Sequence, residues 1–122
     1  MESHERFSPY RIYESSEFRE NLELALELLA KLLESGPELD PAVRQQLRAT
    51  INALFRMAGF KDIEGFSNFL AELYSHFYDD VIEKHEILRS FVISIMKKLG
   101  IKNLNDPKFT EFLKQSLKAE QN

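Results

Sequence analysis

The hydrophobic residues of this chain recur at helical spacing, and the segment from Phe18 to Leu33 is its most apolar part. On a helical wheel, the apolar side chains of this segment cover roughly 240° of the circumference, whereas a typical surface helix has a stripe of about 100°. The polar strip that remains is narrow and consists of Glu20, Glu23, Glu27, Lys31 and Glu34. A helix this apolar must be covered on more than one side. It is either the central helix of a bundle, which we favour, or it also meets another subunit.

Capping residues mark where the helices begin and end. Ser15 or Ser16 begins the first helix, and Gly36–Pro37 ends it, because glycine supplies the left-handed position after a helix and proline cannot continue one. Asp40–Pro41 and Asp106–Pro107 each place proline after an N-cap residue, which is a strong start signal. Gly59 is expected to end the second helix, with Phe60 making the accompanying hydrophobic contact.

The third and fourth helices are separated less clearly. No glycine or proline lies between Phe66 and Leu99, so one continuous helix of roughly 50 Å is compatible with the pattern. That helix would put Lys84 in the buried arc, where a lone charge is costly, so we predict a break within Glu83–Glu86. In the first turn of the third helix, Gly65 costs up to ~1 kcal/mol relative to alanine, which close backbone packing would explain.

The sequence predicts an all-α fold, a compact bundle of about five helices with short loops and the first helix central. Residues 1–14 are expected to form a partly flexible arm, residues 15–118 a single domain and residues 119–122 a frayed tail. The chain has no cysteine, which excludes disulfides and cysteine nucleophiles. No apolar run approaches the ~20 residues of a membrane span. No secretory signal is visible either, so the expected location is the cytoplasm.

Charge is distributed unevenly along the chain. The net charge of −4 divides into −6 for residues 1–40, −2 for residues 41–83 and +4 for residues 84–122. The basic last third, with Lys97, Lys98 and Lys102, supports an alternative function as a small helical subunit that contacts nucleic acid. Arg44, Arg48 and Arg56 on the outer face of the second helix could add to it. Lysines near helix C-termini, however, more commonly neutralise the helix dipole.

A second alternative is a metal-binding helical protein. Glu72, His76, Asp80 and Glu83 are spaced along one helix, and imidazole and carboxylate groups at i, i+4 spacing can hold a divalent ion. Metal sites in helical bundles use ligands that face inward from several helices, whereas these face outward, so a solvated surface is the favoured interpretation. No catalytic residues and no cofactor are predicted, because no nucleophile–base pair and no glycine-rich phosphate loop can be placed.

These patterns favour a non-enzymatic helical module for protein–protein interaction, such as an adaptor, an assembly chaperone or a regulatory subunit. Its expected partner is another protein or a second copy of itself, rather than a membrane. Binding would use an apolar helical face, as when an amphipathic helix lies in a groove. The candidate contact residues are Leu24, Leu28, Tyr74 and Tyr78.

Overall fold

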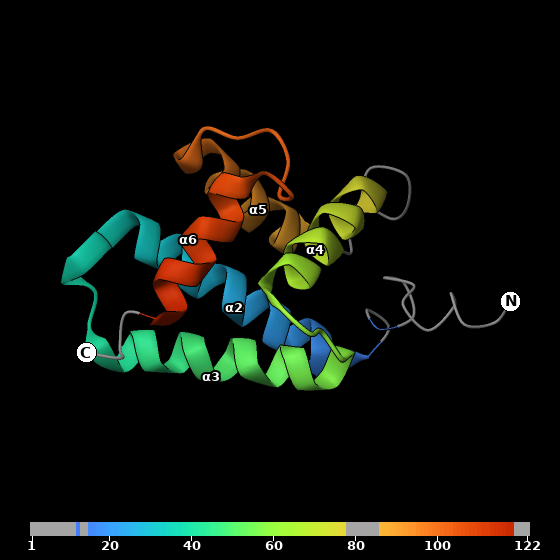
Figure 1. Cartoon of the computed structure of the whole chain (residues 1–122), viewed down its shortest axis with the longest axis horizontal. Helices are drawn as coiled ribbons and strands as arrows, with labels where there is room; N and C mark the ends of the chain where they lie inside the picture. The colour runs from blue at the N-terminus through green and yellow to red at the C-terminus, as the bar shows by residue number, and fades with distance from the viewer. Residues whose placement is uncertain (1–11, 13–14, 78–85, 119–122) are drawn as a thin grey trace, which may run out of the picture.

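The computed structural model describes residues 12, 15–77 and 86–118, and within these residues the chain is all-α (Figure 1). This confirms the predicted fold class. The helices are α2 (Ser16–Ser35), α3 (Pro41–Ala58), α4 (Ile63–Phe77), α5 (Glu86–Leu99) and α6 (Pro107–Lys118), with a short 3-10 turn at Gly36–Glu38.

Helix α2 lies at the centre of the bundle, as its wide apolar arc predicts. It packs against α3 and α5, and its Phe18 ring meets the Phe69 ring of α4 edge-to-face at 5.6 Å between centroids. Its buried side chains are Phe18, Leu22, Ala25, Leu26, Leu28, Leu29 and Leu32. Helix α6 completes the bundle by packing against α4 and α3.

The predicted N-caps are confirmed by their hydrogen bonds. The Phe18 N–H donates to Ser15 Oγ at 3.2 Å, and the Ala42 N–H donates to Asp40 Oδ1 at 3.0 Å. The expectation for Gly36 is only half right: its φ of 62° is positive, but its ψ of −138° is not that of a left-handed helical residue. The difference arises because the chain enters the 3-10 turn at Gly36 instead of leaving the helix in a loop.

Helices α4 and α5 run in different directions, so they are two helices and not one (Figure 1). The break predicted within Glu83–Glu86 lies mostly outside the described residues, which resume at Glu86, the first residue of α5. The expected arm and tail also lie outside them, except for Ile12, which is half-buried against the core.

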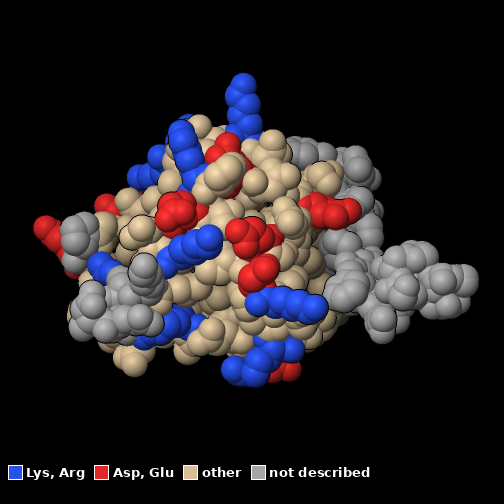
Figure 2. Space-filling view, in the orientation of Figure 1, with Lys and Arg blue, Asp and Glu red and all other residues tan. Residues whose placement is uncertain are grey.

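Two further findings concern the surface. No helix among the described residues is long and apolar enough to cross a membrane. On the face in Figure 2, acidic and basic side chains are interspersed instead of gathering by sign. The charge asymmetry along the chain therefore does not produce a one-signed surface on this face.

Candidate functional site at the corner between α3 and α4

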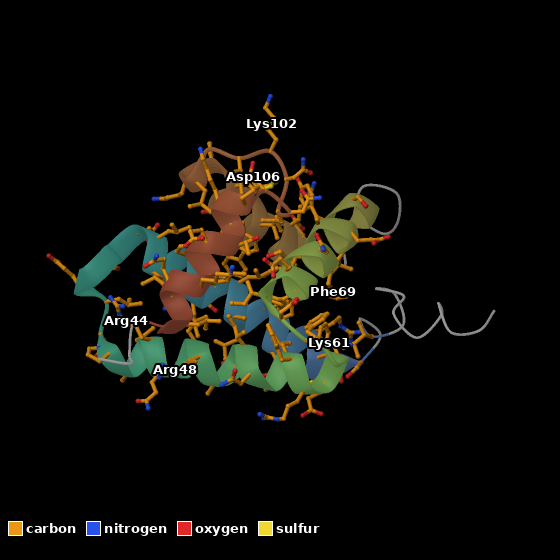
Figure 3. The ribbon with its side chains drawn as sticks, viewed as in Figure 1. Arg44, Arg48, Lys61, Phe69, Lys102 and Asp106 are labelled. Carbon is orange, nitrogen blue, oxygen red and sulfur yellow. The ribbon has the colours of Figure 1, made fainter. Side chains whose placement is uncertain are left out.

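The chain turns sharply between α3 and α4, at the corner that Figure 3 marks with Lys61 and Phe69. Helix α3 ends at Gly59, whose φ of 73° and ψ of 29° are left-handed. The Gly59 and Phe60 N–H groups both donate to the Phe55 carbonyl, at 2.8 and 3.1 Å. The Phe60 ring packs on the Phe55 ring at 5.6 Å, so the predicted hydrophobic contact after the helix is confirmed.

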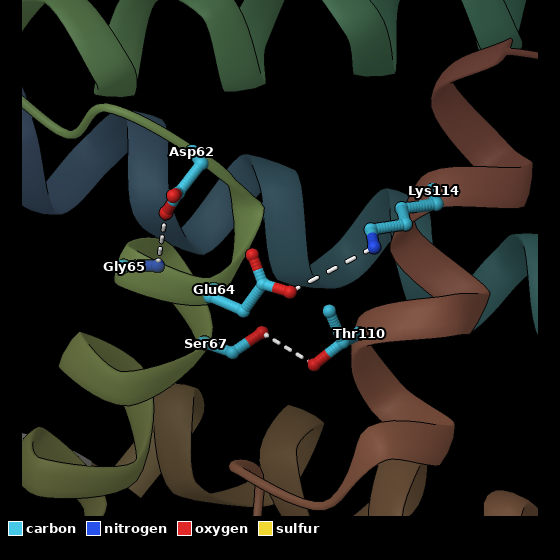
Figure 4. Close-up of polar contacts among 6 residues, drawn as sticks. All are labelled: Asp62, Glu64, Gly65, Ser67, Thr110 and Lys114. Carbon is cyan, nitrogen blue, oxygen red and sulfur yellow. Dashed lines mark hydrogen bonds and ion pairs between the residues drawn. The ribbon is translucent and has the colours of Figure 1, made fainter.

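Helix α4 begins three residues after Phe60. The Gly65 N–H donates to Asp62 Oδ1 at 2.9 Å, which makes Asp62 the N-cap (Figure 4). Because the connection is so short and capped on both sides, the end of α3 and the start of α4 are held in a fixed relation.

Five phenylalanines hold the corner to the bundle. Their ring centroids lie 5.3–5.7 Å apart in five contacting pairs, a spacing typical of aromatic packing. The phenylalanine cluster comprises Phe18 of α2, Phe55 of α3, Phe60 of the connection, and Phe66 and Phe69 of α4. Phe60 is the residue that sequence analysis underestimated, because it contacts the rings of Phe66 and Phe69 as well as that of Phe55.

An open hollow of about 420 Å³ lies against this cluster, and we call it the corner hollow. Its floor is formed by Phe60, Gly65 and Phe69, of which Phe69 is only 8% exposed. Its rim includes the solvent-exposed residues Lys61, Asn68 and Glu72. The site is therefore a hollow with a largely aromatic floor and a polar edge.

Gly65 lines this hollow without a side chain. A Cβ at this position would lie 3.4 Å from Asp62 Oδ1, which is an ordinary van der Waals distance. The expectation that close backbone packing requires the glycine is therefore wrong. A side chain could be built here, and its absence leaves the floor of the hollow without a side chain at one position of α4.

Helix α6 holds the first turns of α4 through polar contacts (Figure 4). The hydroxyl oxygens of Ser67 and Thr110 lie 3.5 Å apart, and Lys114 Nζ lies 3.7 Å from Glu64 Oε2. Ser67 is buried, whereas the Lys114–Glu64 pair is about half exposed and contributes little to stability. These contacts help to keep the α4 wall of the hollow in place.

The structure changes the predicted partner-binding set. Leu28 is 4% exposed and belongs to the core, so it is not available as a surface contact, because α5 as well as α3 covers α2. Leu24 and Tyr74 are half-buried against the core. Tyr78 lies outside the described residues. None of the three described residues lines the corner hollow.

The predicted metal set is described only in part. Glu72 lines the corner hollow, and His76 follows it by one turn of α4. The side chain of His76 and the whole of Asp80 and Glu83 lie outside the described part. Among the residues that the structure describes, no group of three or more histidine or carboxylate side chains could hold a metal ion.

The basic residues lie at two places. Lys97, Lys98 and Lys102 are exposed at the C-terminal end of α5 and in the loop after it, with Lys102 labelled in Figure 3. Arg44 is half-buried, and its Nη2 donates to the Gly36 carbonyl at 3.4 Å, so it is not on the open outer face that the wheel predicted. Arg48 is also half-buried.

Sequence reasoning missed the corner hollow. The available signal was Gly65, a glycine in a helical first turn with no conformational need for it. Comparisons of the chain with protein-family models, with curated proteins and with solved structures give no match.

Proposed function

We propose that this protein is a non-enzymatic interaction module and that its partner is another protein. The observation that supports the proposal is the corner hollow, an apolar depression left open at the surface beside a filled core. Its volume of about 420 Å³ is within the range of roughly 300–1,000 Å³ that is usual for binding pockets.

A partner protein fits this hollow better than a small molecule does. The lining residues that the structure describes all come from one corner of the chain, between Gly59 and Glu72, and the hollow that they form is an open depression. Small-molecule sites bury about 70–90% of the ligand surface, which needs walls all round. A protein brings its own surface to close the open side, as an amphipathic helix does when it lies in a groove.

A second candidate function is contact with nucleic acid, which the exposed Lys97, Lys98 and Lys102 favour. Lys97 and Lys98 are in the last turn of α5, where the helix carbonyls carry negative potential. They therefore stabilise that helix end whether or not a phosphate is bound. This second explanation for their position makes nucleic acid the weaker candidate.

One purification experiment distinguishes a function in protein binding from a function in nucleic-acid binding. The full chain is isolated from the cells that express it, with and without nuclease, and its solution mass is measured by sedimentation equilibrium. We expect a protein at fixed stoichiometry that remains bound after nuclease treatment. A chain that is monomeric at every concentration and brings down no protein contradicts the proposal. Nuclease-sensitive material that is lost in a Lys97→Glu/Lys98→Glu/Lys102→Glu variant supports the second candidate instead.

A further inference from the structure

We infer that the corner hollow receives one large apolar side chain from a helix of the partner protein, and that Glu72 pairs with a basic residue of the same helix. This inference rests on the proposed function and specifies the chemistry of the partner. Three features of the corner support it: the glycine in its floor, the aromatic rings around that glycine, and the charge at each end.

Gly65 occupies a position where alanine would serve the fold better. Glycine in a helix is less favourable than alanine by up to ~1 kcal/mol. Neither of the usual reasons for a glycine applies among the described residues, because the Gly65 backbone is helical and the one contact that a Cβ would meet there is of ordinary length. What the glycine does provide is space on the floor of the hollow. A residue that weakens local structure without a structural reason is typical of a functional position.

The surroundings of that space suit an apolar side chain. Phe60 and Phe69 pack on each other with centroids 5.3 Å apart, and both line the hollow together with Gly65. A leucine, phenylalanine or tryptophan that enters there removes apolar surface from water on both partners, which is the main source of free energy in such contacts.

Charge distinguishes the two ends of the hollow. At one end Lys61 and Asp62 are neighbours of opposite charge, and Asp62 Oδ1 already accepts a hydrogen bond from the Gly65 N–H. That end therefore favours neither a basic nor an acidic residue of the partner. At the other end stands the exposed carboxylate of Glu72. Glu72 follows Gly65 by seven residues, which is about 10 Å along the helix axis. A partner helix lying along α4 is therefore expected to carry lysine or arginine one to two turns from its apolar anchor.

The test uses a phage-displayed library of 16-residue helical peptides on an alanine-rich scaffold, selected on the full chain. The key variant is Gly65→Leu, which fills the hollow from its own floor. Gly65→Ala is an intermediate variant, because its methyl group takes up part of the space that the glycine leaves. Gln115→Leu is the control, because it puts the same leucine side chain on an exposed position of α6 that does not line the hollow. Circular dichroism and thermal melting check that all three variants fold.

We expect the enriched peptides to share one large apolar residue with a lysine or arginine four to seven residues away. Their affinity should fall about ten-fold or more in Gly65→Leu, which is the scale of losing one buried anchor. It should fall by a smaller factor, about two- to five-fold, in Gly65→Ala and stay within about two-fold in Gln115→Leu. Glu72→Arg should remove the preference for a basic residue and keep the preference for the apolar one.

Other results overturn the inference. If the selected peptides bind the Gly65→Leu variant as tightly as they bind the wild-type protein, they use another surface. If the selection enriches no peptide, the hollow does not bind a helix of this kind. A concentration-dependent dimer that Gly65→Leu abolishes makes the occupant a second copy of the chain. If the partner purified from cells binds Gly65→Leu undiminished, the inference is wrong and the proposed function stands. If no partner exists, the proposed function itself is wrong.

Discussion

The chain turns twice between helices with similar capping residues, a glycine and then an aspartate, once from α3 to α4 and once from α5 to α6. Gly59 and Gly100 both have positive φ, at 73° and 70°. In each turn the next N–H donates to a carbonyl five residues back, Phe60 to Phe55 at 3.1 Å and Ile101 to Met96 at 3.0 Å. Each turn then ends at an aspartate, Asp62 or Asp106, that caps the following helix.

The two turns differ in what fills them. The α5–α6 connection is the longer one and sends two side chains into the core, Ile101 at 8% and Leu104 at 1% exposure. The α3–α4 connection sends in only the half-buried Phe60, and Gly65 follows it without a side chain. Similar local capping therefore gives a filled corner in one place and a hollow in the other. The difference lies in the number and size of the side chains that each connection provides.

The largest expected change in the free energy of unfolding comes from removing a buried side chain at the α5–α6 corner. Leu104→Ala removes a side chain that is 1% exposed and should lower the free energy of unfolding by about 3 kcal/mol, the transfer cost plus that of the cavity. At the open corner, Asn68→Ala should change it by less than about 0.5 kcal/mol because Asn68 is exposed. Urea denaturation measures both. A loss below about 1 kcal/mol for Leu104→Ala would show that the α5–α6 corner is loosely packed.

Next in size is the effect of replacing the two turn glycines. In the described part of the chain, a Cβ at Gly59 or Gly100 would meet nothing within 4 Å, so the cost of alanine there is conformational and not steric. Gly59→Ala and Gly100→Ala should each lower the free energy of unfolding by about 1–2 kcal/mol, the usual penalty for a left-handed L-residue. Thermal melting should give nearly equal losses. A clear difference would mean that the two turns do not share one backbone geometry.

The aspartate caps should also be equivalent. Asp62→Ala and Asp106→Ala each remove a hydrogen bond of 2.9 Å to a backbone N–H and should cost about 1 kcal/mol. Asparagine caps a helix about as well as aspartate, so Asp62→Asn and Asp106→Asn should restore most of the loss. Failure of asparagine to do so at Asp62 alone would assign this carboxylate a role beyond capping.

The contrast between the two corners also explains what could be predicted from sequence. The caps at Ser15, Asp40 and Asp106 were predictable because a cap depends on residues within one turn of helix. The central place of α2 was predictable because its apolar arc is wider than one neighbour can cover.

What could not be predicted depends on which helix covers which face. The wheel treats Leu24 and Leu28 alike, yet Leu28 is buried and Leu24 is only half-buried. A wheel does not show how far the helices packed on α2 extend over each position. Arg44 appears exposed on the wheel until the Gly36–Glu38 turn places a carbonyl beside it. The corner hollow depends in the same way on the packing of Phe60 of the connection on Phe69 of α4, which no local pattern specifies.

The smallest expected effect has the opposite sign to the rest, and it concerns Gly65. Because its backbone is helical and a Cβ would meet only an ordinary contact with Asp62, Gly65→Ala should raise the free energy of unfolding by about 0.5–1 kcal/mol. Gly59→Ala, six residues earlier, should lower it, so denaturant titration of the two variants side by side gives opposite shifts. If Gly65→Ala is destabilising instead, this glycine serves the fold after all. The argument that it keeps the corner hollow open then loses its main support.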